Sequence, residues 1–147
     1  MNLATILARK GAQTVTVRSE QTIREGLALL ARHNIGALIV VEGDRPVGIL
    51  SERDIVREVA RREDVVARTV AELMTRDVIT GQPQDDLQSV AHTMTEKRVR
   101  HLPVVDQGRL VGVVSIGDVV KAQRDQYRGE AETLQAQLLG DQPGRSQ

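Results

Sequence analysis

One short pattern occurs twice in the chain, 64 positions apart, and this repetition limits the fold more than any other feature. The first copy is Gly48–Asp54 (GILSERD) and the second is Gly112–Asp118 (GVVSIGD). Each copy is a glycine, two branched apolar residues, a serine, and an aspartate three positions beyond the serine. When 38–56 is aligned without gaps on 102–120, nine of the nineteen positions are identical. The chain is therefore predicted to contain two copies of one supersecondary unit that pack on each other.

Hydrophobic periodicity predicts the order strand, helix, strand, strand, helix in each copy. The uninterrupted apolar run at 37–41 indicates a strand that is covered on both faces. Along the helix that follows the first motif, Ile55, Val56 and Val59 are expected to face inward. The expected elements are strands at 14–17, 37–41, 46–50, 78–80, 102–105 and 110–114, helices at 2–10, 22–34, 52–62, 70–74 and from 85 or 86, a last helix that begins at Ser115, and a further helical stretch past Tyr127.

A repeat this short cannot bury both faces of its own small sheet. The predicted fold class is therefore α+β, with two β-α-β-β-α units packed through their sheets about a pseudo-twofold axis. The expected division of the chain is an N-terminal helical segment at 1–13, a first repeat at 14–62, a linker with a short helix at 63–77, a second repeat at 78–126, and a helical tail at 127–147 whose end is expected to be disordered.

Composition argues against several classes of protein. The 20 basic and 20 acidic residues give a net charge of zero, and Tyr127 is the single aromatic residue, so nucleic-acid binding is disfavoured. Cysteine is absent, which excludes disulfides and thiol nucleophiles. The longest apolar run is far too short to cross a membrane, and the first residues lack the apolar stretch of a signal peptide. A cytoplasmic protein without a membrane partner is expected.

Each Ser-x-x-Asp turn has two interpretations. Ser51 with Asp54, and Ser115 with Asp118, stand where a strand is expected to turn into a helix. Free backbone N–H groups at a helix start attract phosphate, and a carboxylate accepts hydrogen bonds from a diol, so the turn suits a phosphorylated ribose. The same pattern is also close to a capping box, in which the serine and the acid satisfy the helix start by themselves. Duplication does not decide between the interpretations, because a repeated fold repeats its caps.

The order of the elements, the two motifs and the stretch Arg100–Asp106 (RHLPVVD) resemble a tandem pair of CBS domains, the Bateman module. The resemblance covers about 5–126 and is strongest to the stand-alone bacterial type. It implies that adenosine-containing ligands (AMP, ADP, ATP, NAD or S-adenosylmethionine) bind in clefts between the repeats, with AMP the first candidate regulatory ligand. It also implies a homodimer, here expected through helix faces that leave Ile55, Val56, Val119 and Val120 partly uncovered.

Carried over residue by residue, the resemblance implies two clefts. Asp54 and Asp118 would each hold the hydroxyl groups of a ribose. One cleft would combine Asp118 with Ser115 and Val113, and its opposite wall would come from Val15, Ile35 and Gly36. The other would combine Asp54 with Ser51 and Ile49, and its opposite wall would come from Ile79 and Val99.

Phosphate groups need cations, and the resemblance suggests Arg100 and Arg53 as their partners. Ordinary solvated arginines are an equal interpretation of both. The first repeat has Gly36 where the second has Arg100, so the two clefts are expected to differ. His101 is expected to be structural or exposed. The other two histidines have no ligand-type partner at suitable spacing, so no metal site is predicted.

Four functions follow from these interpretations. The first is a regulatory module that binds an adenosyl ligand and passes a change of shape to a protein target that the sequence does not identify. The second is a structural dimerisation module with vestigial clefts. An enzyme is disfavoured, because no nucleophile–base pair, phosphate-binding glycine loop or metal constellation is recognised. Nucleic-acid binding is disfavoured by charge and composition.

Overall fold

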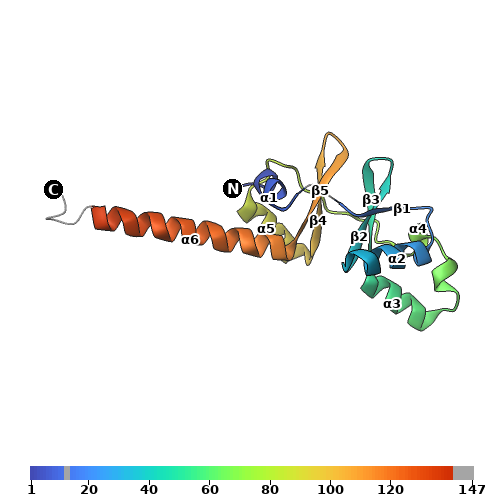
Figure 1. The fold of residues 1–147 in the computed structure, drawn as a ribbon. Coiled ribbons are helices and arrows are strands. Elements are labelled where there is room, and N and C mark those ends of the chain that lie inside the picture. The colour runs from blue at the N-terminus through green and yellow to red at the C-terminus, as the bar shows by residue number, and fades with distance from the viewer. Residues whose placement is uncertain (12–13, 141–147) are drawn as a thin grey trace.

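The computed structural model of the protein describes residues 1–11 and 14–140, and Figure 1 shows two hairpins standing side by side with helices beneath them. The last helix extends far beyond the rest of the molecule. The elements are α1 (Leu3–Lys10), β1 (Thr16–Arg18), α2 (Ile23–His33), β2 (Ala37–Glu42), β3 (Arg45–Ser51), α3 (Glu52–Arg61), a 3-10 turn η1 (Val65–Ala67), α4 (Val70–Leu73), α5 (Leu87–Lys97), β4 (His101–Asp106), β5 (Arg109–Ser115) and α6 (Ile116–Gly140).

The two hairpins are copies of each other in register as well as in sequence. Ala37 pairs with Ser51 in the first, and His101 pairs with Ser115 in the second, at the same offset as the motif. Both ladders shift register between the two consecutive valines of the inner strand, which are Val40 and Val41 in the first hairpin. The predicted α+β fold with two repeated units is therefore confirmed.

The strand predicted at 78–80 is wrong. β1 pairs in parallel with β2 in the first repeat. In the second repeat, among the described residues, the sheet contains β4 and β5, and Gly81 meets β4 through an isolated bridge to Val104. Gly81 donates to the Pro103 carbonyl at 2.9 Å and accepts from Val105 at 2.8 Å. The next ladder bonds on either side would need N–H groups of Pro103 and Pro83, which proline lacks.

Each repeat has its own hydrophobic core, and a helix from outside the repeat contributes to each core. The first core contains Leu38 and Leu50, and the short helix α4 adds Val70 to it. The second core contains Leu102, and α1 adds Leu3 and Ile6. The N-terminal helix therefore belongs to the second repeat, although it precedes the first in the sequence.

The motif glycines allow these crossing segments to pass close to the hairpins. A Cβ atom on Gly48 would lie 2.5 Å from Sδ of Met74 and 3.0 Å from the carbonyl oxygen of Thr75. A Cβ atom on Gly112 would lie 2.6 Å from Cδ2 of Leu7. The end of α1 and the segment after α4 thus occupy equivalent places on the two hairpins. The repeats themselves meet through β3 and β5, and Leu110 N–H donates to the Asp44 carbonyl at 2.8 Å.

Two of the three residues expected to face inward from α3 do not. Ile55 is buried, but Val56 is 65% exposed and Val59 is 55% exposed. Val56 lies about 100° around the helix from Ile55, on a side of α3 that the neighbouring elements leave uncovered. On α6 the equivalent pair behaves alike, because Val119 is buried and Val120 is 54% exposed. The expected partial exposure of Ile55 and Val119 is therefore wrong as well.

The helical stretch expected past Tyr127 is the continuation of the helix that begins after Ser115, and it runs without a break to Gly140. Every residue of α6 from Tyr127 onward is exposed. The disorder expected at the C-terminal end concerns 141–147, which lie outside the described residues. Within the described ranges, no helix has both the length and the apolar character that crossing a bilayer requires.

Candidate functional site

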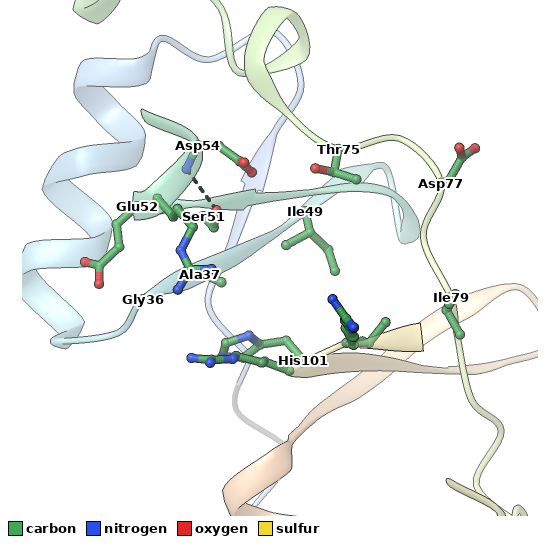
Figure 2. A pocket seen from close by; sticks show the side chains of 14 residues that line it. Gly36, Ala37, Ile49, Ser51, Glu52, Asp54, Thr75, Asp77, Ile79 and His101 are labelled. Atoms are coloured by element: carbon green, nitrogen blue, oxygen red, sulfur yellow. Dashed lines mark hydrogen bonds between the residues drawn. The ribbon is translucent and has the colours of Figure 1, made fainter. Parts of the chain in front are cut away.

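Two clefts lie between the repeats, and each contains the aspartate of one motif. We call them the Asp54 cleft and the Asp118 cleft. The Asp54 cleft has a volume of about 380 Å³, and Figure 2 shows Ile49 and Ser51 on one wall with Ile79 and His101 opposite. The Asp118 cleft measures about 280 Å³.

The Asp54 cleft brings together all the residues that the sequence assigned to it. Arg53 and Arg100, suggested as phosphate contacts, line it too. Gly36 also lines this cleft, although it was expected on the wall opposite Asp118. The full lining is Gly36, Ala37, Ile49, Ser51, Glu52, Arg53, Asp54, Thr75, Asp77, Ile79, Arg98, Val99, Arg100 and His101.

The residues that the sequence assigned to the Asp118 cleft line it, with the exception of Gly36. Ile35 lines the Asp118 cleft and Gly36 the Asp54 cleft, so the segment that leads into β2 runs between the two clefts. The full lining is Lys10, Thr14, Val15, Ile35, Ala37, Ile39, His101, Val113, Ser115 and Asp118.

The first motif forms only half of a capping box. Ser51 is the N-cap of α3, and its Oγ accepts a hydrogen bond from the Asp54 N–H at 3.1 Å. Among the described residues, the Asp54 carboxylate makes no hydrogen bond and no ion pair. Figure 2 shows this carboxylate turned toward the side of the cleft where Thr75 lies, away from Glu52. The serine is therefore a cap, and the carboxylate is left available to a ligand.

The second motif forms the complete box. Asp118 N–H donates to Ser115 Oγ at 3.1 Å, and Ser115 N–H donates to Asp118 Oδ2 at 2.9 Å. Lys10 Nζ donates to the same Oδ2 at 2.7 Å and to the carbonyl oxygen of Val113 at 2.8 Å. Burial would raise the pKa of Asp118, but the hydrogen bonds from Lys10 and Ser115 outweigh it and hold the pKa below its usual value.

The two clefts also differ in charge. The Asp54 cleft holds Arg53, Arg98 and Arg100, together with three carboxylates. In the Asp118 cleft, Lys10 is the basic residue and Asp118 the acidic residue of the lining. His101 contributes to both clefts, and burial, followed by the nearby charges of Lys10 and Arg100, lowers its pKa. No group of three side chains suited to hold a metal ion occurs within the ranges that the structure describes.

Sequence reasoning missed two cations that line the clefts. Arg98 ends α5 in the left-handed conformation, with φ of 55°, and matches Asn34 at the end of α2. Extending the repeat alignment back by four positions would have paired Arg98 with Asn34, next to the predicted wall residue Val99, and would have indicated Arg98 as a candidate cleft residue. Lys10 carries no such signal, since it precedes the repeated region and meets Asp118 only through the tertiary fold.

Comparisons with known proteins agree with this architecture. A family model described as the CBS domain matches residues 11–61 and again residues 70–125. The CBS domain-containing protein YhcV of Bacillus subtilis is 35% identical over 122 residues, which span 82% of this chain and 87% of YhcV.

Two solved structures are similar over most of their length. The CBS-domain containing protein ATU1752 of Agrobacterium tumefaciens superposes with a TM-score of 0.77 at 38% identity, over 84% of this chain and 99% of that one. The CBS domain pair of protein MJ0100, in complex with 5′-methylthioadenosine and S-adenosyl-L-methionine, superposes with a TM-score of 0.74 at 30% identity. That match covers 86% of this chain and 98% of the other.

Proposed function

We propose that this chain, which belongs to the CBS domain family and contains the domain twice, is a regulatory module that binds an adenosine-containing nucleotide between its repeats. The observation that carries the proposal is the Asp54 carboxylate, which lines a cleft without a protein partner among the described residues. A carboxylate in this position accepts two hydrogen bonds from the 2′ and 3′ hydroxyl groups of a ribose. The ligands of the MJ0100 pair both contain an adenosyl group, which supports the same class here.

The walls of the Asp54 cleft suit an adenine base without any aromatic side chain. Ile49 from β3 faces Ile79 and Val99 from the second repeat across the cleft. Aliphatic side chains on opposite sides of a cleft can hold a flat base between them, and a volume of about 380 Å³ lies in the range of small-molecule sites. The base would lie between these aliphatic side chains.

The arginines favour a phosphorylated ligand. Guanidinium groups form strong, charge-assisted hydrogen bonds with phosphate oxygens, and three arginines line this cleft. AMP, the smallest phosphorylated compound of the set, is our first candidate, and the arginines favour it, ADP, ATP and NAD alike over S-adenosylmethionine. Binding would draw the two repeats together and pass that change to a protein target.

Calorimetry with these five compounds tests the proposal. Asp54→Asn keeps the helix start but removes the charge, and the loss of hydrogen bonds to a charged group should weaken AMP binding by about 1.5–3 kcal/mol. Asp106→Asn, at the exposed end of β4 and outside both clefts, is the matched control and should bind like the wild type. If no compound gives heat with the wild-type chain, the module is structural and its clefts are vestigial.

We also propose that the module acts as a homodimer. α3 and α6 are equivalent helices, and each leaves a valine exposed at the same repeat position, Val56 and Val120. The remainder of α6 adds Tyr127, Leu134 and Leu138, also exposed. A second copy that covered these faces would bury apolar area that is otherwise in water.

Light scattering should then report twice the chain mass of 16.1 kDa. Val120→Lys should shift the assembly toward the single chain, because it introduces a charge into the proposed interface. The matched control Val111→Lys alters an exposed valine on β5 and should remain dimeric. A wild-type mass of one chain would contradict the dimer.

A further inference from the structure

Lys10 occupies the Asp118 cleft at the two acceptors that a nucleoside would need. Its Nζ atom lies 2.7 Å from Asp118 Oδ2 and 2.8 Å from the Val113 carbonyl oxygen. The carboxylate is the acceptor for ribose hydroxyl groups, and the carbonyl stands beside the wall proposed for the base. We propose that Lys10 sets the ligand preference of this cleft, favouring nucleoside 5′-phosphates over uncharged or cationic adenosyl compounds. This inference rests on the proposed function.

The segment that crosses the other hairpin brings the opposite charge to its cleft. Leu7 touches the motif glycine of the second hairpin, and Met74 touches that of the first. Three residues beyond Leu7 is Lys10, which lines the Asp118 cleft, and three residues beyond Met74 is Asp77, which lines the Asp54 cleft. The repeats therefore share a scaffold, while the segments that cross them bring opposite charges to the two sites.

A phosphate can replace Asp118 as the partner of Lys10. The lysine side chain is 36% exposed, so its ammonium can turn toward an incoming group without unfolding α1. Once the ammonium pairs with phosphate oxygens, the Asp118 carboxylate is released to accept the ribose hydroxyl groups. Each charge keeps a partner throughout, so the exchange leaves neither the lysine nor the aspartate unpaired in a partly buried site.

Other adenosyl compounds offer no such exchange. An uncharged nucleoside that displaces Lys10 from Asp118 leaves the ammonium without an anion. S-adenosylmethionine adds positive charge beside Lys10, because its sulfonium and amino groups are both cationic. Among the residues that line this cleft, Asp118 is the one carboxylate, so a second cation finds no further counter-ion there.

The test measures AMP and adenosine binding in a chain whose Asp54 cleft has been weakened. Calorimetry is carried out on the full chain carrying Asp54→Asn, which weakens the other cleft, with Lys10 either kept or changed to methionine. Methionine preserves most of the length of the side chain and removes its charge. With Lys10 present, AMP should bind about tenfold more tightly than adenosine, as expected when one charge-assisted pair is gained. In the chain that also carries Lys10→Met, the two affinities should become similar, through weaker AMP binding and tighter adenosine binding.

Two further variants separate charge from structure. Lys10→Arg restores the cation and should restore the preference for AMP. Lys97→Met removes an exposed lysine at the end of α5, outside both clefts, and should leave the ratio unchanged. The ratio of two affinities measured on one protein is independent of a general loss of stability.

Three outcomes would contradict either the role of Lys10, the Asp118 cleft as a nucleoside site, or the proposed function. An AMP-to-adenosine ratio that Lys10→Met leaves unchanged would overturn the role of Lys10. If the wild-type chain binds AMP but the Asp54→Asn chain binds neither compound, with or without Lys10, then the Asp118 cleft is not a nucleoside site and this inference alone fails. If the wild-type chain binds neither compound, nor any other in the five-compound panel, the proposed function fails with it.

Discussion

The two Ser-x-x-Asp turns have the same spacing and the same backbone role, yet they are in different chemical states. At the first, Ser51 caps α3, and the Asp54 carboxylate lines the cleft without a partner among the described residues. At the second, the carboxylate of Asp118 completes the capping box and pairs with Lys10. A repeated motif thus fixes where a carboxylate lies, while the segment that crosses the hairpin decides whether it is already engaged. The capping box is complete in the second repeat alone, and the first repeat keeps its carboxylate for the proposed ligand.

The largest effects should come from the cores, where the two repeats are most alike. Leu38 and Leu102 are identical, equivalent and buried in separate clusters. Replacing either with alanine should lower the free energy of unfolding by about 2–5 kcal/mol, from lost burial and a cavity. Urea denaturation of the single and double variants checks this. Because the cores are separate, the two losses should add within about 0.5 kcal/mol, and strong non-additivity would show that the repeats share one core.

The next largest effects should come from the motif glycines, where substitution should cost different amounts of stability in the two repeats. A methyl group on Gly48 meets the backbone oxygen of Thr75, whereas the three atoms nearest to one on Gly112 all belong to the side chain of Leu7, which can move. Gly48→Ala and Gly112→Ala should each destabilise the chain by about 1–3 kcal/mol, with Gly48→Ala the more costly. Gly117→Ala is the matched control, since its nearest neighbour, Ser115 Oγ, would be 3.6 Å away. Thermal melts in which Gly112→Ala is the worse of the two would break this comparison.

The two aspartates should then differ in the absence of ligand. Asp118→Asn removes the charge that holds both Lys10 and the Ser115 N–H, so it should lower the free energy of unfolding by about 1 kcal/mol, the size of a typical cap. Asp54→Asn removes no protein contact among the described residues and should leave the ligand-free stability near that of the wild type. Urea titrations of both variants measure the difference. Equal losses would mean that the Asp54 carboxylate is also a cap.

Local signals in the sequence predicted most of the fold. The helices expected from 22 and from 85 or 86 begin where Thr22 caps α2 and Asp86 caps α5, and the hairpins fall where the apolar runs lie. The error at 78–80 arose because apolar composition was weighed without the missing N–H of Pro103. The exposure of Val56 depends on how much of α3 the neighbouring helices cover, which no local pattern records.

The candidate site divides in the same way. The repeat carries its own residues to the clefts, so Asp54 and Asp118 could be found from the alignment. Gly36 was assigned to the wrong cleft because the segment that leads into β2 runs between the two clefts, and its adjacent residues line different sites. Lys10 lies 108 positions from Asp118, and a contact of that separation exists only once the chain has folded.

The smallest predicted effect is the pH dependence of the second turn. The pKa of Asp118 is lowered in the folded chain, so the unfolded chain binds a proton more readily, and the stabilising contribution is complete above the unfolded pKa of 3.8. It should be lost as the pH falls through the lower, folded pKa. The free-energy difference between wild type and Asp118→Asn should therefore shrink as urea titrations move from neutral pH to below about pH 4. In a Lys10→Met background the same difference should be smaller at every pH, because one of the groups that lower the pKa is gone. A difference that grew on acidification would have the wrong sign for an engaged carboxylate and would contradict the pairing of Asp118 with Lys10.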